Sequence, residues 1–389
     1  APPKFAGSQA PSNWGEDLLL PRQWEARGHA RGKLAPGGWI ARCDPDGKNI
    51  QMVSSGYRNQ YDIAMNAENE MFTYDADMEW DIGMPWYRPT RVCHVTSGSE
   101  FGWRSGTGKW PAYYEDSLPP TLDIGPGSPT GITFGTGAKF PARYQDALFI
   151  LDWTFGTIYA VHLEPSGSSY TATKEDFVWS KPLAVTDAVV GDDGALYFAV
   201  GGRGSQSALY RVVYTGPEPT DPIAGLAPGG SPVVAEDRGA SARELRRSLE
   251  TYHGRVDPTA VDAAWPHLGS EDRFVRFAAR IAVENQPVES WRRRALDERD
   301  EQSAVVALIA LARQGDATDL PGIVAALGRL DLEGLTEQQR LATLRAYALA
   351  FVRLGEPTGA MRNELIARFD VLFPASSNAV NTELARLLT

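Results

Sequence analysis

The sequence of 389 residues contains little cysteine or histidine. It has two cysteines and five histidines. Cys43 and Cys93 form neither a CxxC pair nor a CxxCH haem-attachment motif. A haem or a structural zinc bound by this chain is therefore not expected. The two thiols are either free and buried or joined in one disulfide, and the sequence leaves both alternatives open.

Long apolar runs and clustered positive charges are also absent. No stretch reaches the roughly 18 apolar residues that a membrane span requires, so no transmembrane segment is expected. The formal net charge is −11. Nucleic acids and anionic membranes bind clustered Lys and Arg, so neither is expected as a partner. The first residues lack a charged segment followed by an apolar one, and no signal peptide is expected in this chain.

The composition divides the chain into a β part followed by an α part. Residues 1–33 are rich in Pro, Gly and charge and are expected to form an irregular lead-in. Residues 34–214 show short apolar or alternating runs between turn residues, which is typical of an all-β domain. Residues 215–238 form a Pro/Gly-rich linker. Residues 239–389 carry helical periodicity.

One pattern recurs within residues 34–214: an apolar run, a polar turn, and then an aromatic-rich strand. It is clearest in YDIAMNAENEMFTYD (61–75) and TDAVVGDDGALYFAV (186–200). In both, an Asp precedes the apolar run. Units repeated at roughly 40 to 60 residues are typical of the blades of a β-propeller. About four units are visible, whereas about six are expected of this type, which indicates an incomplete propeller.

The periodicity changes after residue 239. The segment SEDRFVRFAARIAVENQP is expected to form a helix with four apolar residues on one face: Phe274, Phe277, Ala278 and Ile281. The segment EQSAVVALIALARQG is apolar nearly all round, as in a helix buried between neighbours. Gly315 is expected to end that helix.

A third helix is predicted for LTEQQRLATLRAYALAFVRLG. It starts with a capping-box pattern at Thr336 and Gln339 and ends at Gly355. Several helices joined by short turns favour a HEAT-like α-solenoid, in which each helix pair covers its predecessor. Such solenoids usually serve as interaction surfaces, so a protein partner is expected for residues 239–389.

Four acidic residues alternate with apolar ones in YDADMEWD. On a strand all four would share one face. Such a face is a hydrated edge strand, a set of ion pairs with Arg88 or Arg91, or a Ca²⁺ site with several oxygen ligands. An EF-hand is excluded because Trp80 stands where that loop requires Gly. The four acids are Asp75, Asp77, Glu79 and Asp81.

Residues 34–214 resemble the propeller of soluble pyrroloquinoline-quinone (PQQ)-dependent sugar dehydrogenases, the glucose/sorbosone dehydrogenase family. The matching phrases are DPDGKNIQMVSSGYRNQYDIA, YDADMEWD, CHVTSGSEFGW, PTGITFGTGAKFPARYQDALFILDWTFGTIYAV and DAVVGDDGALYFAVGGRG. The chain is still more similar to the propeller-plus-HEAT portion of large bacterial proteins described as membrane-bound dehydrogenases or haem-binding proteins. In those proteins a c-type cytochrome domain commonly follows the helices. The resemblance implies a periplasmic or extracellular location.

The resemblance also implies a chemistry. A sugar or polyol would lose hydride to PQQ, Ca²⁺ would polarise the quinone, and a c-type cytochrome would accept the electrons. The phrase GYRN places Arg58 and Asn59 at the quinone and substrate site, where a guanidinium can hold anionic oxygens through paired donors. The alternative is that Arg58 binds a carboxylate such as Asp62. The acidic stretch aligns with the family's calcium-associated loop, so its four acids are the implied metal ligands.

The sequence departs from this family in three places. No residue matches the family's catalytic histidine, and His94, expected in a loop, is the candidate base, with a structural role as the alternative. Ala184 and Thr186 replace two arginines that hold the cofactor. Trp153 and Thr154 stand where the family has a cofactor-contacting lysine.

Arg203, in GGRG, is the remaining cofactor-binding candidate, although a Gly-flanked Arg is equally suited to capping a turn. The alternative to an enzyme is a non-catalytic carbohydrate- or protein-binding scaffold. Four aromatic residues suit either sugar stacking or packing between blades: Trp103, Trp110, Tyr113 and Tyr114.

Overall fold

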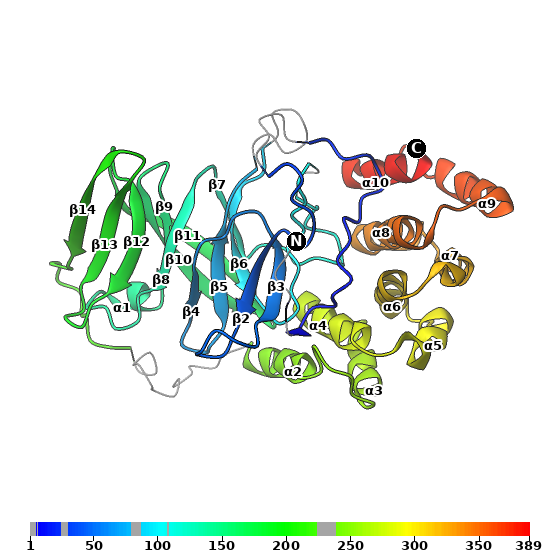
Figure 1. Cartoon of the computed structure of the whole chain (residues 1–389), viewed down its shortest axis with the longest axis horizontal. Coiled ribbons are helices and arrows are strands. Elements are labelled where there is room, and N and C mark those ends of the chain that lie inside the picture. The colour runs from blue at the N-terminus through cyan, green and yellow to red at the C-terminus, as the bar shows by residue number, and fades with distance from the viewer. Residues whose placement is uncertain (1–4, 6, 25–29, 79–86, 107–108, 224–238) are drawn as a thin grey trace.

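A computed structural model describes residues 5, 7–24, 30–78, 87–106, 109–223 and 239–389. Within these ranges the chain forms four consecutive β-sheets and then a series of helices (Figure 1). The predicted order of a β part followed by an α part is therefore confirmed. Both described cysteines are free thiols, so the disulfide alternative is wrong.

The sheets follow one another along the chain and are antiparallel apart from one pairing. In the first sheet the short strand β1 pairs parallel with β3. Its strands are β1 (Gly7–Ser8), β2 (Gly38–Arg42) and β3 (Gln51–Tyr57). The second sheet contains β4 (Ile63–Met65), β5 (Met71–Asp75), β6 (Thr90–Val95) and β7 (Leu122–Gly125).

The third sheet contains β8 (Pro129–Phe134), β9 (Leu148–Asp152), β10 (Thr157–Ser166) and β11 (Ser169–Trp179), with the short helix α1 (Ala142–Gln145) between β8 and β9. The fourth contains β12 (Val185–Val190), β13 (Leu196–Gly202) and β14 (Ser205–Val212). The hairpins predicted in 61–75 and 186–200 are confirmed as β4–β5 and β12–β13.

The sheets stack face to face because their central strands are apolar on both sides. In β9, Leu148 and Ile150 pack in a core with residues of the second sheet such as Phe72. Phe149 and Leu151 point the other way, into a core shared with the fourth sheet. This alternation with a period of two is the pattern of a strand buried between two sheets. The blades of a propeller would stack in the same way, and the propeller itself stays a prediction.

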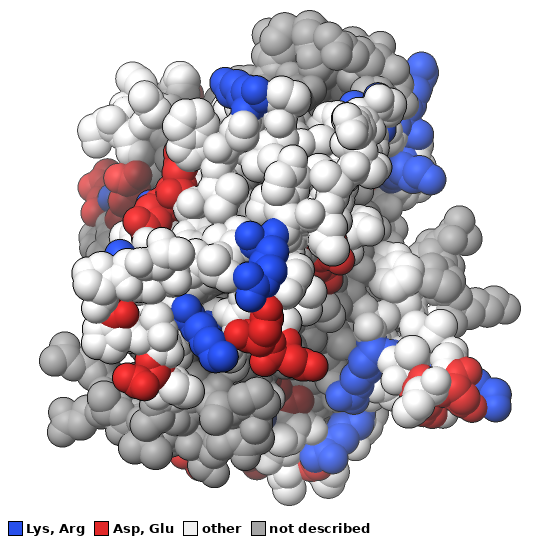
Figure 2. Space-filling model, turned by 90° about the vertical axis from the view of Figure 1, so that its left-hand side faces the viewer, with Lys and Arg blue, Asp and Glu red and all other residues white. Residues whose placement is uncertain are grey.

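The fourth sheet lies at one end of this series (Figure 1). Its outer face is open to solvent, and Val189 and Leu209 on it are 60% and 71% exposed. Viewed from this end, much of the surface is uncharged and the charged side chains occur in scattered groups (Figure 2). The fourth sheet also carries an ion pair between Arg211 of β14 and Asp193, which is half-exposed.

The helices form two layers. The layer nearer the sheets contains α2 (Ala240–Glu250), α4 (Arg273–Glu284), α6 (Glu301–Gln314), α8 (Glu337–Leu354) and α10 (Asn378–Leu388), which pack on one another in this order (Figure 1). The outer layer contains α3 (Ala260–Ala264), α5 (Arg292–Asp297), α7 (Leu320–Gly328) and α9 (Gly359–Asp370). Their assignment as HEAT-like repeats stays a prediction. None of the described helices combines the length and the apolar character needed to cross a membrane.

The predicted helix ends are confirmed. Gly315 is the C-cap of α6, and Gly355, with a φ of 123°, is the C-cap of α8. Thr336 and Gln339 form the expected capping box at the start of α8. The predicted single apolar face of α4 is instead divided: Phe274, Phe277 and Ile281 pack toward the sheets, whereas Ala278 belongs to the core between the helices.

Buried arginines of the inner helices pair with acidic residues of the sheet part. Glu70 is central: both carboxylate oxygens lie 2.6 Å from Nη2 of Arg246, and Oε1 also accepts from Arg247. Burial alone would raise the pKa of Glu70, but the hydrogen bond with His94 and the charge of Arg246 lower it to about 2. Similar pairs follow along the helices: Arg276 with Glu115, Arg345 with Asp116, and Arg353 with Asp17.

The described residues of the lead-in (residues 1–33) are mostly irregular, as predicted. They also form part of the interface between the sheets and the inner helices. It runs between the sheets and the inner helices (Figure 1). There Asp17 accepts hydrogen bonds from Arg353 and Arg313, which belong to the inner layer. The sheets and the lead-in thus cover much of the inner layer of helices. The protein partner expected for residues 239–389 stays a prediction, and such a partner would bind the helix faces that point away from the sheets.

The ion pairs of Glu70 are testable by substitution. Glu70→Gln keeps the shape of the side chain but leaves Arg246 buried without its main counter-charge from the sheets. We expect the free energy of unfolding, measured in urea, to fall by about 3 to 5 kcal/mol. As a matched control, Asp193→Asn removes a carboxylate from the half-exposed pair with Arg211, and its unfolding midpoint should equal that of the unsubstituted protein. Equal midpoints for both variants would contradict the role of Glu70.

Candidate functional site

One rim of the stacked sheets collects most residues that the resemblance assigns to chemistry. The strands β3, β5, β9 and β13 end at this rim, and β4, β6, β8 and β12 begin there. Arg58 and Asn59 follow β3, Asp75 ends β5, and Arg203 follows β13. The predicted cofactor residues therefore lie on the same rim, although they come from different sheets.

Asp75 is fully buried, with 0% of its surface exposed. Its Oδ1 accepts hydrogen bonds from the backbone N–H groups of Arg58 and Asn59, at 3.0 and 2.9 Å. Its Oδ2 accepts from Nε and Nη2 of Arg91, at 3.1 and 3.0 Å. Burial would raise the pKa of Asp75, but Lys109 and Arg91 outweigh it and lower the pKa. The ion pair with Arg91 is confirmed, and both carboxylate oxygens are engaged within the protein.

The other acids of this stretch share no exposed face in the described residues. Asp77 is buried beyond the end of β5, and its Oδ2 accepts from the N–H of Gly127 at 3.2 Å. The hydrated-edge alternative is therefore wrong for Asp75 and Asp77. Glu79 and Asp81 lie outside the described residues. No group of three or more His, Cys, Asp or Glu side chains in the described ranges could hold a metal ion.

Further aspartates on this rim accept hydrogen bonds from backbone N–H groups of strands and turns. Asp62 accepts from its neighbour Ile63 and, in the next sheet, from Ile132, at 2.8 and 3.2 Å. Oδ1 of Asp152 accepts from three turn residues, at 2.8 to 3.1 Å. Asp187 accepts from the residue that follows it. The Asp that precedes the apolar run in both hairpins, Asp62 and Asp187, thus accepts the backbone N–H of the strand residue that follows it.

Arg203 occupies the tight turn between β13 and β14. Its φ is 49°, in the left-handed region. Its guanidinium carbon lies 5.2 Å from the ring centroid of Trp153, and the indole N–H of Trp153 donates to the carbonyl of Gly201 at 2.8 Å. These contacts fit the turn interpretation of Arg203.

His94 does not occupy a loop, so that prediction is wrong; it lies in β6, one residue before the end of the strand, and is 0% exposed. Its Nε2 lies 2.7 Å from Oε2 of Glu70, and its Nδ1 lies 2.9 Å from Oγ of Ser169. Phe72 and Phe274 stack on the ring, at centroid distances of 5.0 and 5.5 Å. With both nitrogens bonded and both neighbours aromatic, His94 is in a structural position where no substrate reaches it.

His253, just after α2, is buried in the same way. Its Nε2 donates to the carbonyl of Ala278 at 3.0 Å, and its Nδ1 accepts from the hydroxyl of Ser97 at 2.8 Å. Burial lowers the pKa of His253 to about 4, and it also lowers that of His94. Both histidines contact the sheet part on one side and helix α4 on the other.

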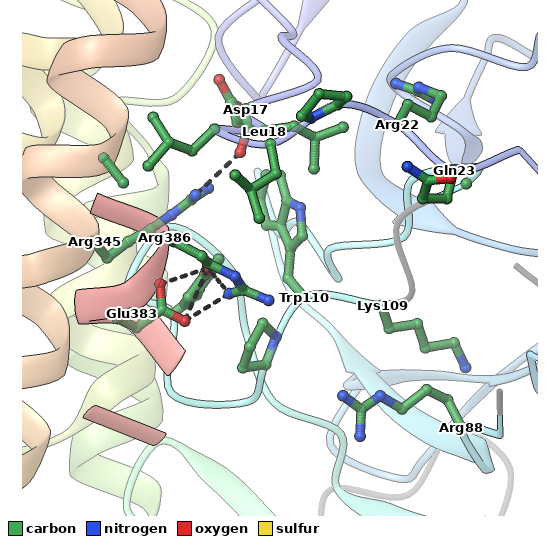
Figure 3. A pocket seen from close by; sticks show the side chains of 17 residues that line it. Asp17, Leu18, Arg22, Gln23, Arg88, Lys109, Trp110, Arg345, Glu383 and Arg386 are labelled. Carbon is green, nitrogen blue, oxygen red and sulfur yellow. Dashed lines mark hydrogen bonds and ion pairs between the residues drawn. The ribbon is translucent and has the colours of Figure 1, made fainter. Parts of the chain in front are cut away.

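A cavity of about 300 Å³ lies where the lead-in, the loop after β6 and the helices α8 and α10 meet. Its lining includes Arg88, Lys109, Trp110, Pro111 and Arg386, which also line an adjoining pocket of about 510 Å³. Figure 3 shows Arg88, Lys109, Trp110 and Arg386 among the side chains that line the smaller cavity. The sequence analysis did not identify this cavity, because Arg386 is far from Arg88 and Lys109 in the sequence and the three share no motif.

The aromatic residues proposed for sugar stacking are mostly packed. Trp103, Trp110 and Tyr114 are buried. Guanidinium groups lie over the ring of Trp110, that of Arg104 at 4.3 Å and that of Arg345 at 4.8 Å from its centroid. Packing is therefore the better description for these three side chains.

Comparison with known proteins gives distant matches to solved structures and no match by sequence. No family model and no curated protein matches the sequence. An oxidoreductase (glucose dehydrogenase) of Thermus thermophilus is 19% identical, with 45% of this chain and 55% of that chain covered and a TM-score of 0.35. The PQQ-bound form of an aldose sugar dehydrogenase from Streptomyces coelicolor is 16% identical, with 47% and 54% covered and a TM-score of 0.35. The chain spans about half the length of these structures, and at this score they carry no conclusion about function.

The buried histidines predict how stability depends on pH. Their pKa values are lower in the folded than in the unfolded chain, so the unfolded chain binds protons first as the pH falls. Stability is complete above the unfolded pKa of about 6.5 and declines below it. For His253 the loss should reach about 3 kcal/mol near pH 4, because a pKa unit corresponds to about 1.4 kcal/mol.

Urea unfolding from pH 7.5 to 4.5 checks this dependence. His253→Gln lowers stability at pH 7.5 but should show a shallower decline with acid than the unsubstituted protein. The control His267→Gln changes a partly exposed histidine in the same region and should retain the original slope. A His253→Gln profile parallel to the original would show that His253 is not the titrating group.

Proposed function

We propose that the chain is a sugar-dehydrogenase-like sheet module, joined rigidly to helices, that binds a ligand without oxidising it. The main support is the position of His94, the candidate base of the sequence analysis. Its nitrogens hold Glu70 and Ser169, and Glu70 in turn holds Arg246 of α2. The imidazole of His94 therefore stabilises the contact between the sheets and the helices. It is buried and cannot reach the hydroxyl of a substrate.

The residues of the rim do not fit PQQ, which carries three carboxylates. Arg58 and Arg203 are the predicted cations. Four aspartates of the same rim disfavour an anion there: Asp62, Asp77, Asp152 and Asp187. Like charges repel, and more strongly where water is excluded. Thr186, at one position where the family has an arginine, donates to the carbonyl of Ala199. We therefore derive no quinone step for this chain.

The second candidate is the PQQ- and Ca²⁺-dependent oxidation of a sugar or polyol, with a c-type cytochrome as electron acceptor and a periplasmic or extracellular location. It draws support from the sequence resemblance and from the placement of Arg58, Asn59 and Arg203 on one rim. Glu79 and Asp81, its remaining metal candidates, lie outside the described residues.

Quinone titration separates the two candidates. We expect no saturable binding of PQQ, with or without Ca²⁺, and no dye reduction above background with a panel of aldoses and polyols. A PQQ-dependent sugar dehydrogenase assayed in parallel provides the positive control. A panel compound that raises the unfolding midpoint should be recovered chemically unchanged. Saturable quinone binding with turnover that Arg58→Ala abolishes would instead establish the dehydrogenase chemistry.

A further inference from the structure

The strand β14 is an open edge of the fourth sheet. Among the described residues the strand order is β12–β13–β14, so β14 pairs with β13 on one side and with no strand on the other. Every residue of β14 except Val212 is exposed. The backbone N–H and C=O groups on its free side therefore face solvent. In Figure 1 the strand lies at the end of the series of sheets, away from the helices.

The second and third sheets limit strand pairing at the corresponding edges. The edge strand β7 of the second sheet is 4 residues long. The edge strand β11 of the third sheet is longer but carries Lys174, Glu175 and Asp176 in succession. Short edge strands and charged side chains are the usual protection against pairing with another chain. The strand β14 has neither: it is 8 residues long, it contains no Pro and no Lys, and its single charge is that of Arg211.

The middle of β14 is also regular enough to pair. Its register with β13 is continuous from Ala208 to Val212, and the shift in this ladder lies between Val200 and Gly202, close to the turn. A bulge in the middle of an edge strand would twist it away from a partner. The half of β14 that follows Ala208 has none.

The charge of Arg211 is compensated within its own sheet. Its Nη2 lies 2.7 Å from Oδ2 of Asp193, and its Nε donates to that oxygen and to the hydroxyl of Tyr197, at 3.0 Å each. The edge is therefore close to neutral. In a chain with a formal net charge of −11, two copies repel each other overall, so they approach most easily where the surface is neutral.

The open face of the fourth sheet brings apolar surface up to this edge. Leu209 of β14 pairs across the ladder with Ala199 of β13, and Tyr197 of β13 pairs with Val189 of β12. Leu209 and Val189 are 71% and 60% exposed. A second sheet joined at β14 would continue this apolar patch and would remove part of the Leu209 side chain from water.

We propose that β14 pairs antiparallel with β14 of a second copy of this chain, which joins two three-stranded sheets into one of six strands. Such a pair is related by a two-fold axis perpendicular to the sheet, so the residue on the axis faces its own copy. If Leu209 lies on the axis, Arg211 faces Ser207 of the second copy; if Tyr210 does, Arg211 faces Leu209. In both registers no like charges stand opposite each other, a contact that would be unfavourable.

A second copy matches this edge better than an unrelated extended segment. It brings a strand of equal length, the same neutral charge and the same apolar face, and the two-fold axis keeps both apolar faces on one side of the joined sheet. The inference goes beyond the proposed function, because the pairing needs no ligand.

The mass of the full chain in solution tests the association. An interface built on one strand pair is small, so we expect a dissociation constant of about 10 to 100 µM. Analytical ultracentrifugation from about 1 to 500 µM should then show a weight-average mass that rises from one chain toward two. The mass of a single chain over the whole range would overturn the proposal.

Matched substitutions on the open face locate the contact. Leu209→Lys places a cation opposite its own copy or opposite Arg211 and should weaken the association at least about tenfold. The control Val189→Lys introduces the same charge on the same face, two strands from the edge, and should leave the dissociation constant unchanged. Weakening by both variants would indicate packing of the sheets face to face and would contradict pairing at the edge.

Two further measurements separate the contact from a folding defect. Leu209→Glu chains added to Leu209→Lys chains should restore a mixed pair, which a misfolded chain could not form. Amide hydrogen exchange within Ser205–Val212 should slow several-fold when the unsubstituted protein is concentrated through its dissociation constant, whereas exchange within β11 should not change. Concentration-dependent protection that leaves β14 unaffected would place the interface elsewhere.

Discussion

The packing of the helices against the sheets depends on the ion pairs and hydrogen bonds of the Glu70 carboxylate. This carboxylate lies in the turn before β5 and meets two arginines of α2 and the imidazole of His94. Removing these charges from water is costly, and the cost is offset because each partner is also hydrogen-bonded. Since α2 begins the helical series, this contact fixes where the series starts relative to the sheets. The pairs of Glu115, Asp116 and Asp17 then fix the helices that follow.

Local features were predictable from the sequence because their causes are local. Two hairpins, the capping box at Thr336 and the glycine that ends α8 all follow from residues within a few positions. The interface was not predictable, because Glu70 and Arg246 are 176 residues apart and each looks like an ordinary polar residue of a turn or a helix face. The β-branched residues around His94, which are Thr90, Val92 and Val95, were the missed signal of a strand.

The residues of the rim show why similar sequence segments indicate a similar local structure but do not establish the same reaction. Asp75 binds the backbone of the GYRN turn and the side chain of Arg91, and Asp62 joins two sheets. Each of these contacts gives Asp75 or Asp62 a structural role that needs no metal and no cofactor. A short turn whose N–H groups point inward needs an acceptor in any protein with this sheet arrangement. The sequence segments shared with the sugar dehydrogenases therefore fit a module that oxidises a sugar and equally one that does not.

In the four ion pairs named above, those of Glu70, Glu115, Asp116 and Asp17, the carboxylate lies closer to the N-terminus than its arginine, and this order has a consequence for synthesis on the ribosome. Asp17 precedes Arg353 by 336 residues. At roughly 5 to 20 residues per second, about 17 to 70 seconds pass between the emergence of the two side chains. During this time the acidic surface of the nascent sheets carries an uncompensated negative charge. Burying an unpaired charge is costly, so these carboxylates disfavour burial of that face before the arginines are present.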